Sequence, residues 1–221
     1  MFISRLILRR KPRTLRTMVE ILRQGLNDPS NAHRLLWSLF TGNGDNAKRD
    51  FLFRAGGGSS SPDGDFLIVS QRWPKDCLGL WNIETKTYDP KFAPGQTLAF
   101  QLRVNPTVAR GGKRHDIVMD RKRMLGESRE ETNAELWEHA GRDWLDARAA
   151  RLGTSLLVCR ADNYHVHRFH RTEKRGYISI AMLDLSGRLR VEEPEKLTGA
   201  IFSGVGRGKA WGCGLLLVRP G

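Results

Sequence analysis

The sequence predicts an α+β fold built from two ferredoxin-like domains in tandem, and three observations lead to this prediction. The first half of the chain alternates apolar, strand-like runs with a helical segment in the order β-α-β-β. A basic stretch with paired glycines interrupts the pattern after Pro106. The second half again alternates helical and strand-like segments and closes on the apolar run LLLV.

The first domain is expected to span residues 1–106 and to begin with a strand over residues 3–8, where apolar residues cluster before the basic RRKPR. A helix follows in DPSNAHRLLWSLF, because Asp28 can serve as an N-cap and Pro29 suits the first helical position. FLFR and FLIVSQR predict two strands on either side of the turn-rich GGGSSSPDGD. LAFQLRVNP predicts a further strand that ends at Pro106.

Residues 107–127 are expected to form a basic linker or insertion, since lysine and arginine dominate there and two glycines are paired. The second domain is expected over residues 128–221 and opens with a helix. Ser128 and Glu131 have the spacing of a capping box, apolar residues continue at helical intervals, and Gly153 ends the helix.

Three further strands are expected in the second domain, at SLLVCR, YISIAMLDL and LRV. HVHRFHRTEKRG predicts a basic loop between the first two, and Gly187 predicts a turn between the second and third. A helix is expected over residues 194–202, followed by the glycine-rich GVGRGKAWGCG and the final strand LLLV. The order of elements again has ferredoxin character.

The charge of the chain favours a nucleic-acid partner. Lysine and arginine number 37 against 24 aspartates and glutamates, a formal net charge of +13, and several separate basic runs indicate a track for phosphate groups. No apolar run approaches the roughly 20 residues of a membrane span, so no membrane partner is expected. The N-terminus lacks the pattern of a secretory signal, and a cytoplasmic location is expected.

No metal and no cofactor are expected. The three cysteines, Cys77, Cys159 and Cys213, are scattered and lack C-x-x-C spacing, which argues against a zinc site or a disulfide framework. His165 and His167 of HVHRFH would share one face of a strand and could in principle bind a metal. The cations around them and the lack of a fixed further ligand favour contact with RNA instead.

The glycine-rich segment has five glycines from Gly204 to Gly214, interleaved with Arg207 and Lys209. Glycine lets a backbone approach a ligand closely, so the segment could cradle a phosphate, and a glycine-rich turn at a sheet edge is the alternative. The two cations favour the cradle. Neither the Walker nor the Rossmann pattern fits, because Lys209 is followed by Ala210 and the segment leads into a strand.

His33 lies on the predicted first helix, one residue after Ala32 and at the edge of the apolar face. A lone histidine in such a place is most often a partly exposed side chain without a catalytic role. Helical periodicity alone therefore favours that interpretation over a general base.

Several segments together, namely RDFLF, FQLRVNP, GKRHDIVMD, AGRDWL and GVGRGKAWGCGLLLV, resemble the CasE family of CRISPR-associated endoribonucleases from type I-E systems. The resemblance implies tandem ferredoxin-like, RNA-recognition-motif-like domains of RAMP type. It also implies that the protein binds the stem-loop of the CRISPR repeat, cuts precursor RNA at the base of the stem without a metal, and remains with other subunits in the Cascade complex.

The same resemblance implies that His33 is catalytic, because the family carries its catalytic histidine on the first helix. As general base, His33 would take the proton of a ribose 2′-hydroxyl, and the products would be a 2′,3′-cyclic phosphate and a 5′-hydroxyl. Family members often have a tyrosine three residues before this histidine, and this chain has Ser30. Either Ser30 positions the substrate, or a cation such as Arg34, Arg207 or Lys209 neutralises the phosphate.

The alternative interpretations are a non-catalytic RNA-hairpin-binding module of RNA-recognition type and, less favoured, a metal-dependent nuclease, for which HVHRFH lacks a carboxylate pair. The endoribonuclease and the RNA-binding module both require a basic surface that contacts RNA. The residues expected to contact RNA are Lys113, Arg114, Arg160, His167, Arg168, Arg171, Lys174, Arg175, Ser203, Gly204, Gly206, Arg207 and Lys209.

Overall fold

The computed structural model divides the chain into two compact units. The first contains Met1–Pro90 and Lys209–Leu215, and the second contains Lys91–Gly208 and Leu216–Gly221. The residues that the structure describes are 1–9, 29–40, 50–56, 65–126, 130–170 and 177–221. Within these ranges, no helix is both long and apolar enough to cross a membrane.

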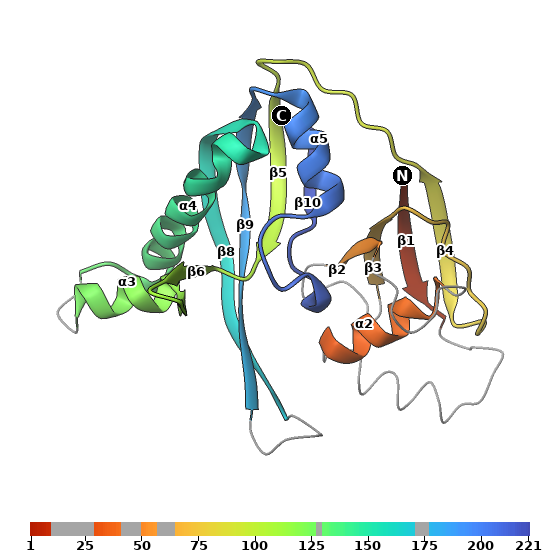
Figure 1. Cartoon of the computed structure of the whole chain (residues 1–221), viewed down its shortest axis with the longest axis horizontal. Helices are drawn as coiled ribbons and strands as arrows, with labels where there is room; N and C mark the ends of the chain where they lie inside the picture. Colours follow the sequence, from red (N-terminus) through yellow and green to blue (C-terminus); the bar gives the residue numbers. More distant parts are fainter. Residues whose placement is uncertain (10–28, 41–49, 57–64, 127–129, 171–176) are drawn as a thin grey trace. The chain divides into compact units, whose positions relative to one another are not determined.

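Four antiparallel strands form the sheet of the first unit, in the order β2-β3-β1-β4, and the helix α2 packs against one face (Figure 1). The first three strands and the helix are those expected from the sequence, whereas the sequence analysis does not predict β4. The bounds of these elements are Phe2–Leu8 for β1, Pro29–Trp37 for α2, Phe51–Ala55 for β2, Asp65–Ser70 for β3 and Trp81–Thr87 for β4.

The core of the first unit lies between α2 and this sheet. Leu36 of α2, Leu6 of β1 and Ile68 of β3 are fully buried, and Phe53 of β2 and Trp81 of β4 are almost so. Burying each aliphatic side chain stabilises the fold by about 2 kcal/mol. This core therefore fixes the position of α2 on the sheet.

The second unit has its own antiparallel sheet, made of β5 (Thr97–Val104), β8 (Thr154–His170), β9 (Tyr177–Val191) and β10 (Leu216–Pro220). The order is β10-β5-β9-β8. When the strands of each four-stranded sheet are numbered in chain order, both sheets follow the order fourth-first-third-second. The predicted α+β class, with tandem ferredoxin-like units, is confirmed.

Two helices cover one face of the second sheet (Figure 1): α4 (Asn133–Leu152) packs on β8 and β9, and α5 (Pro194–Ser203) packs on β10. Gly141 lets α4 approach β9 closely, since a Cβ there would lie 2.5 Å from a methyl carbon of Leu185. Gly153 ends α4 in the left-handed conformation, with φ 68°, as the sequence predicts.

The capping box of α4 differs from the predicted one. Thr132 accepts a hydrogen bond from the backbone N–H of Glu135, whose carboxylate in turn accepts one from the Thr132 N–H at 2.8 Å. The segment ESREETNAE contains the Ser/Thr-x-x-Glu spacing twice, and the helix uses the second copy. Glu131 instead binds the guanidinium of Arg121, and Ser128 lies outside the described residues.

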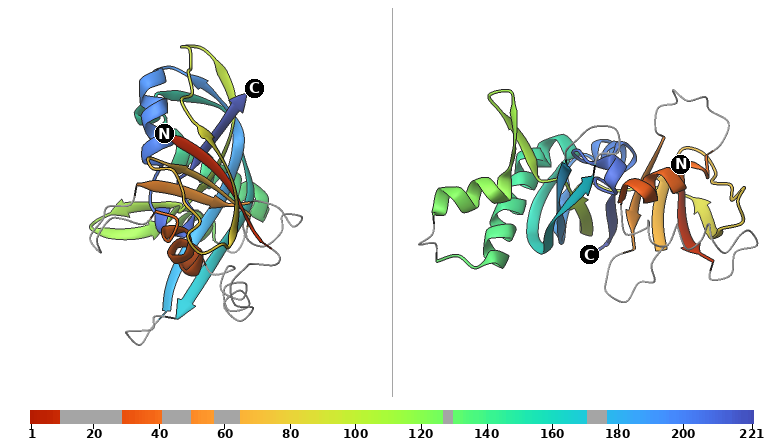
Figure 2. Two further views of the ribbon diagram at one scale, coloured as in Figure 1. Left: turned by 90° about the vertical axis from the view of Figure 1, so that its right-hand side faces the viewer. Right: turned by 90° about the horizontal axis from the view of Figure 1, so that it is seen from below.

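The stretch expected to be a basic linker or insertion folds as a hairpin and a helix within the second unit: β6 (Thr107–Arg110), β7 (Lys113–Asp116) and α3 (Ile117–Leu125). Figure 2 shows this hairpin beside α3. Gly111 and Gly112 have φ values of 54° and 73°, and a two-residue hairpin turn of this kind needs positive φ at both positions. Local backbone chemistry, not only charge, explains the paired glycines.

The long hairpin of β8 and β9 corrects two expectations. HVHRFH belongs to β8 and is not a loop, because its backbone pairs with β9 along its whole length. Gly187 lies within β9 and does not form a turn. A Cβ at Gly187 would lie 1.9 Å from the carbonyl oxygen of Val158, next to a shift in strand register. Close approach of β8 therefore requires this glycine.

The strand near residue 100, expected to end the first domain, belongs to the second sheet. In β5, Leu102 lies opposite Leu185 of β9 on one side and Leu216 of β10 on the other. These partners come from much later in the chain, so local periodicity carries no information about the pairing. The second compact unit accordingly begins at Lys91, before the boundary expected at residue 106.

Candidate active site

His33 of α2 packs against an aromatic wall in the first unit. Its ring centroid lies 5.7 Å from that of Trp37, 6.0 Å from Phe51 and 6.1 Å from Phe53. Trp37 lies one helical turn after His33 in α2. Phe51 and Phe53 are two residues apart in β2 and therefore lie on the same face of the strand. His33 itself is half-buried. The wall restricts the orientation of the imidazole, whose Nε2 atom is buried.

Arg72 ties the chain beyond α2 to the start of β2. Its guanidinium donates to the carbonyl oxygen of Phe40 at 3.0 Å and to both carboxylate oxygens of Asp50, at 2.5 and 3.1 Å. The hydrogen bonds that Arg72 donates to Asp50 raise the pKa of Arg72 above its ordinary value. This arrangement connects the helix that carries His33 to the strand that carries Phe51 and Phe53.

The later part of the glycine-rich segment completes the first unit. A 3₁₀ turn, η1 (Lys209–Trp211), packs against α2 and β2. Gly212 follows with φ 78°, and a Cβ there would lie 3.3 Å from Cε2 of Phe53. The fold thus brings Lys209 into the same unit as His33, and it places Gly212 against a ring that contacts the His33 imidazole.

The earlier part of the segment belongs to the second unit. Gly204 ends α5 with φ 78° and donates its N–H to the carbonyl oxygen of Ala200. Gly206, with φ 75°, lies against the indole of Trp144, where a Cβ would approach to 2.9 Å. Arg207 is exposed and forms an isolated antiparallel bridge with Asn105. Backbone conformation and close packing therefore account for these glycines.

The end of the β8–β9 hairpin carries the predicted histidine pair. The rings of His165 and His167 lie 4.6 Å apart, almost perpendicular, and the exposed Arg168 follows. Burial lowers the pKa of His165, with further lowering from His167 and Arg103 that is opposed by Asp184. Across the described ranges, no three histidine, cysteine or carboxylate side chains gather in a way that could hold a metal ion.

The other predicted RNA contacts fall at several places. Lys113 and Arg114 are exposed on β7, Arg160 is exposed on β8, and Ser203 is exposed at the end of α5. Ser30 lies one helical turn before His33 in α2. The structure thus distributes these residues over both units, and Arg171, Lys174 and Arg175 lie outside the described residues.

The sequence analysis misses the two phenylalanines beside His33. The alternation of Phe51 and Phe53 in FLF indicates that both point to one face of a strand, but it does not indicate which helix they meet. Trp144 is expected only as an apolar residue of its helix, without a role in a site. Its indole N–H donates to the carbonyl oxygen of Thr107 and its ring lies 3.7 Å beneath the guanidinium of Arg148, whose pKa burial lowers.

Comparisons with known proteins show which family the chain belongs to. A family model described as CRISPR associated protein matches residues 1–220. The CRISPR-associated endoribonuclease Cse3 of Thermus thermophilus is 31% identical over 147 residues, which cover 61% of this chain and 61% of that protein. The CRISPR system Cascade subunit CasE of Escherichia coli is 28% identical over 207 residues, 91% of this chain and 97% of that protein.

The fold gives a consistent result. A solved structure of Thermus thermophilus Cse3, bound to an RNA representing a pre-cleavage complex, matches with a TM-score of 0.74 and 25% identity, over 99% of this chain and 98% of that one. Sequence and fold thus agree over almost the whole length. The chain belongs to the family of CRISPR associated proteins that includes Cse3 and CasE.

Proposed function

We propose that this protein binds the stem-loop of a CRISPR repeat, cleaves precursor CRISPR RNA at the base of the stem, and remains on the product as a Cascade subunit. The main support is one observation: His33 lies on α2 against an aromatic wall, in the unit to which the glycine-rich segment contributes Lys209. The relatives named as an endoribonuclease and a Cascade subunit support the same activity and partners. We place this activity in the cytoplasm, where precursor CRISPR RNA would be the substrate.

His33 acts as general base in this proposal. It takes the proton of the ribose 2′-hydroxyl, and the 2′ oxygen attacks the adjacent phosphorus. The bond from phosphorus to the 5′ oxygen then breaks, and a proton reaches the departing oxygen. The products are a 2′,3′-cyclic phosphate and a 5′-hydroxyl, and the reaction requires no metal ion.

Lys209 is the cation that we assign to the phosphate. The negative charge on the phosphate oxygens grows as the new bond forms, and a fixed ammonium group stabilises it. Lys209 lies in η1, which packs against α2, whereas Arg207 belongs to the second unit. Ser30, one turn before His33, is proposed to position the substrate.

The second unit supplies most of the proposed RNA contacts. Exposed cations on β7 and β8 bind phosphates. Gly204 and Gly206, which follow α5, allow backbone groups to approach phosphates as well. Duplex RNA is recognised through such phosphate and ribose contacts. The contacts proposed within the described residues are Lys113, Arg114, Arg160, His167, Arg168, Ser203, Gly204, Gly206, Arg207 and Lys209.

Cleavage and binding of repeat RNA by His33→Ala test this function. The variant is expected to cleave at least about 100-fold more slowly, because general-base catalysis is lost, while its affinity for the stem-loop stays close to that of the parent. His139→Ala, which changes an exposed histidine on α4, is the matched control and should cleave normally. Normal cleavage by His33→Ala would refute the assignment, and tight binding without cleavage by the parent would favour the RNA-binding module.

The same assay separates Lys209 from Arg207. Lys209→Ala should slow cleavage at saturating protein, because charge stabilisation is lost in the transition state. Arg207→Ala should weaken binding and leave the saturated rate near that of the parent. The reverse pattern would transfer the phosphate role to Arg207.

A further inference from the structure

The sheet of the second unit presents two different faces. In β5, Leu98 and Leu102 are buried on the face that α4 and α5 cover, whereas Gln101 is exposed on the other. Gln101 lies opposite Ser186 of β9 and Leu217 of β10, which share its side of the sheet. We call the face that carries Gln101, Ser186 and Leu217 the open face.

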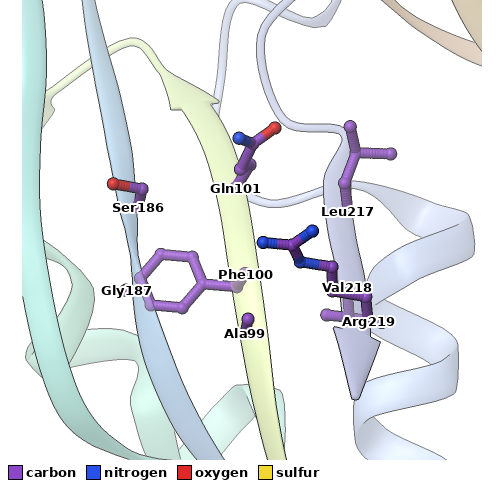
Figure 3. Close-up of a pocket in the computed structure, with 8 residues that line it drawn as sticks. All are labelled: Ala99, Phe100, Gln101, Ser186, Gly187, Leu217, Val218 and Arg219. Atoms are coloured by element: carbon purple, nitrogen blue, oxygen red, sulfur yellow. The ribbon is translucent and has the colours of Figure 1, made fainter. Parts of the chain in front are cut away.

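A hollow of about 430 Å³ lies on the open face. This volume falls within the range of small-ligand sites and suits one nucleotide. A small residue keeps the hollow open, because Ala99 offers only a methyl group. Its lining, drawn in Figure 3, is Ala99, Phe100, Gln101, Ser186, Gly187, Leu217, Val218 and Arg219.

The surroundings of the hollow are basic. Arg188 and Arg190 follow Ser186 at alternate positions of β9, and Arg160 of β8 lies opposite Ser186. Figure 3 shows the guanidinium of Arg219 reaching from β10 towards β5. All four arginines are exposed, and none of their guanidinium groups makes a hydrogen bond or ion pair with the described part of the chain.

The acidic groups of this face are already engaged. Asp184 accepts two hydrogen bonds from the guanidinium of Arg103, at 2.8 and 2.9 Å. Asp162 accepts one from the hydroxyl of Ser186 at 3.1 Å. The unpaired arginines therefore leave the open face with an excess of positive charge next to a nucleotide-sized hollow, which is the complement of an RNA strand.

We propose that the open face binds single-stranded RNA flanking the repeat stem-loop, with one nucleotide in the hollow. The guanidinium groups of Arg219 and Arg188 contact phosphates or stack on bases, and the Gln101 amide meets a base edge as donor and acceptor. Phe100 is buried, so stacking falls to guanidinium planes. A duplex keeps its bases paired and stacked and cannot place one in the hollow.

This inference rests on the proposed function, because binding of the stem-loop brings the single-stranded flank close to the protein. A single-nucleotide site is weak alone, but binding of the stem-loop makes the second contact intramolecular and raises the effective concentration of the flank. The open face then adds affinity and holds the strand beyond the stem. It contributes to binding of the flanked RNA and not to the chemical step.

Two RNAs test the proposal: the bare repeat stem-loop and the same stem-loop with single-stranded flanks, both with a 2′-deoxy nucleotide at the cut site. The parent should bind the flanked RNA about tenfold more tightly. Gln101→Ala with Arg219→Ala should abolish that gain and bind the bare stem-loop as the parent does. Arg151→Ala, which removes an exposed arginine at the end of α4, should keep the gain.

Equal affinity of the parent for both RNAs would overturn the proposal, and so would an equal loss for both RNAs in the double variant. Photo-crosslinking with 4-thiouridine in the flank tests it in the unaltered protein, where peptides of β5, β9 or β10 should be labelled. Labelling elsewhere alone would contradict it. Failure of the proposed function is a separate result, namely no cleavage of an unmodified bare stem-loop by the parent.

Discussion

The imidazole of His33 is oriented by residues that lie far from it in the sequence. Phe53 touches it from β2, and Gly212 backs that ring from the C-terminal segment. The sequence predicts the helix of His33 and the alternation of Phe51 with Phe53, since both depend on local periodicity. It cannot predict that Gly212 meets Phe53, because that contact depends on how the whole first unit folds.

Gly212→Ala is expected to slow cleavage about tenfold and to lower stability more than a matched glycine substitution. Its φ of 78° disfavours alanine, and the new methyl group would displace the Phe53 ring that contacts His33. Gly95→Ala is the control, since its φ is 81° and nothing lies within 4 Å of its Cβ position. Thermal unfolding and single-turnover cleavage measure both effects. Identical behaviour of the two variants would show that Gly212 does not position the ring.

The β8–β9 hairpin shows the limits of sequence patterns at the scale of elements. HVHRFH is basic and was expected in a loop, but its alternating side chains suit a strand equally well. Pairing with β9 decides between the two structures, and charge does not. The strand β4 was missed for a similar reason. Trp81, Ile83 and Thr85 alternate towards the core, but the polar residues between them make the apolar pattern weak, and pairing with β1 decides the structure.

Acidification is expected to destabilise this hairpin through His165. Because burial lowers the folded pKa of His165, the unfolded chain takes up its proton first, near the ordinary value of about 6.5. Stability is therefore full above that pH and is lost as the pH falls through it towards the folded pKa. Thermal melts between pH 7.5 and 5 should show a smaller loss for His165→Gln than for the parent. The same dependence of thermal stability on pH in His165→Gln and the parent would contradict this prediction, and His139→Gln is the control.

The whole molecule repeats one topology with different insertions. Both sheets have the same strand order, and the hairpin β6–β7 with α3 enlarges only the second unit. The ferredoxin-like class follows from element order and could be predicted. The unit to which β5 belongs could not, nor could the return of Lys209–Leu215 to the first unit, because both depend on pairing between distant segments.

Cleavage of repeat RNA with a single 2′-deoxy nucleotide at the cut site, measured with a chelator present, tests the central claim most directly. The proposed function predicts that the unmodified RNA is cut in chelator to a 2′,3′-cyclic phosphate, and that the deoxy RNA is bound but stays intact, because the attacking oxygen is missing. Cleavage of the deoxy RNA, or loss of all cleavage in chelator, would contradict it.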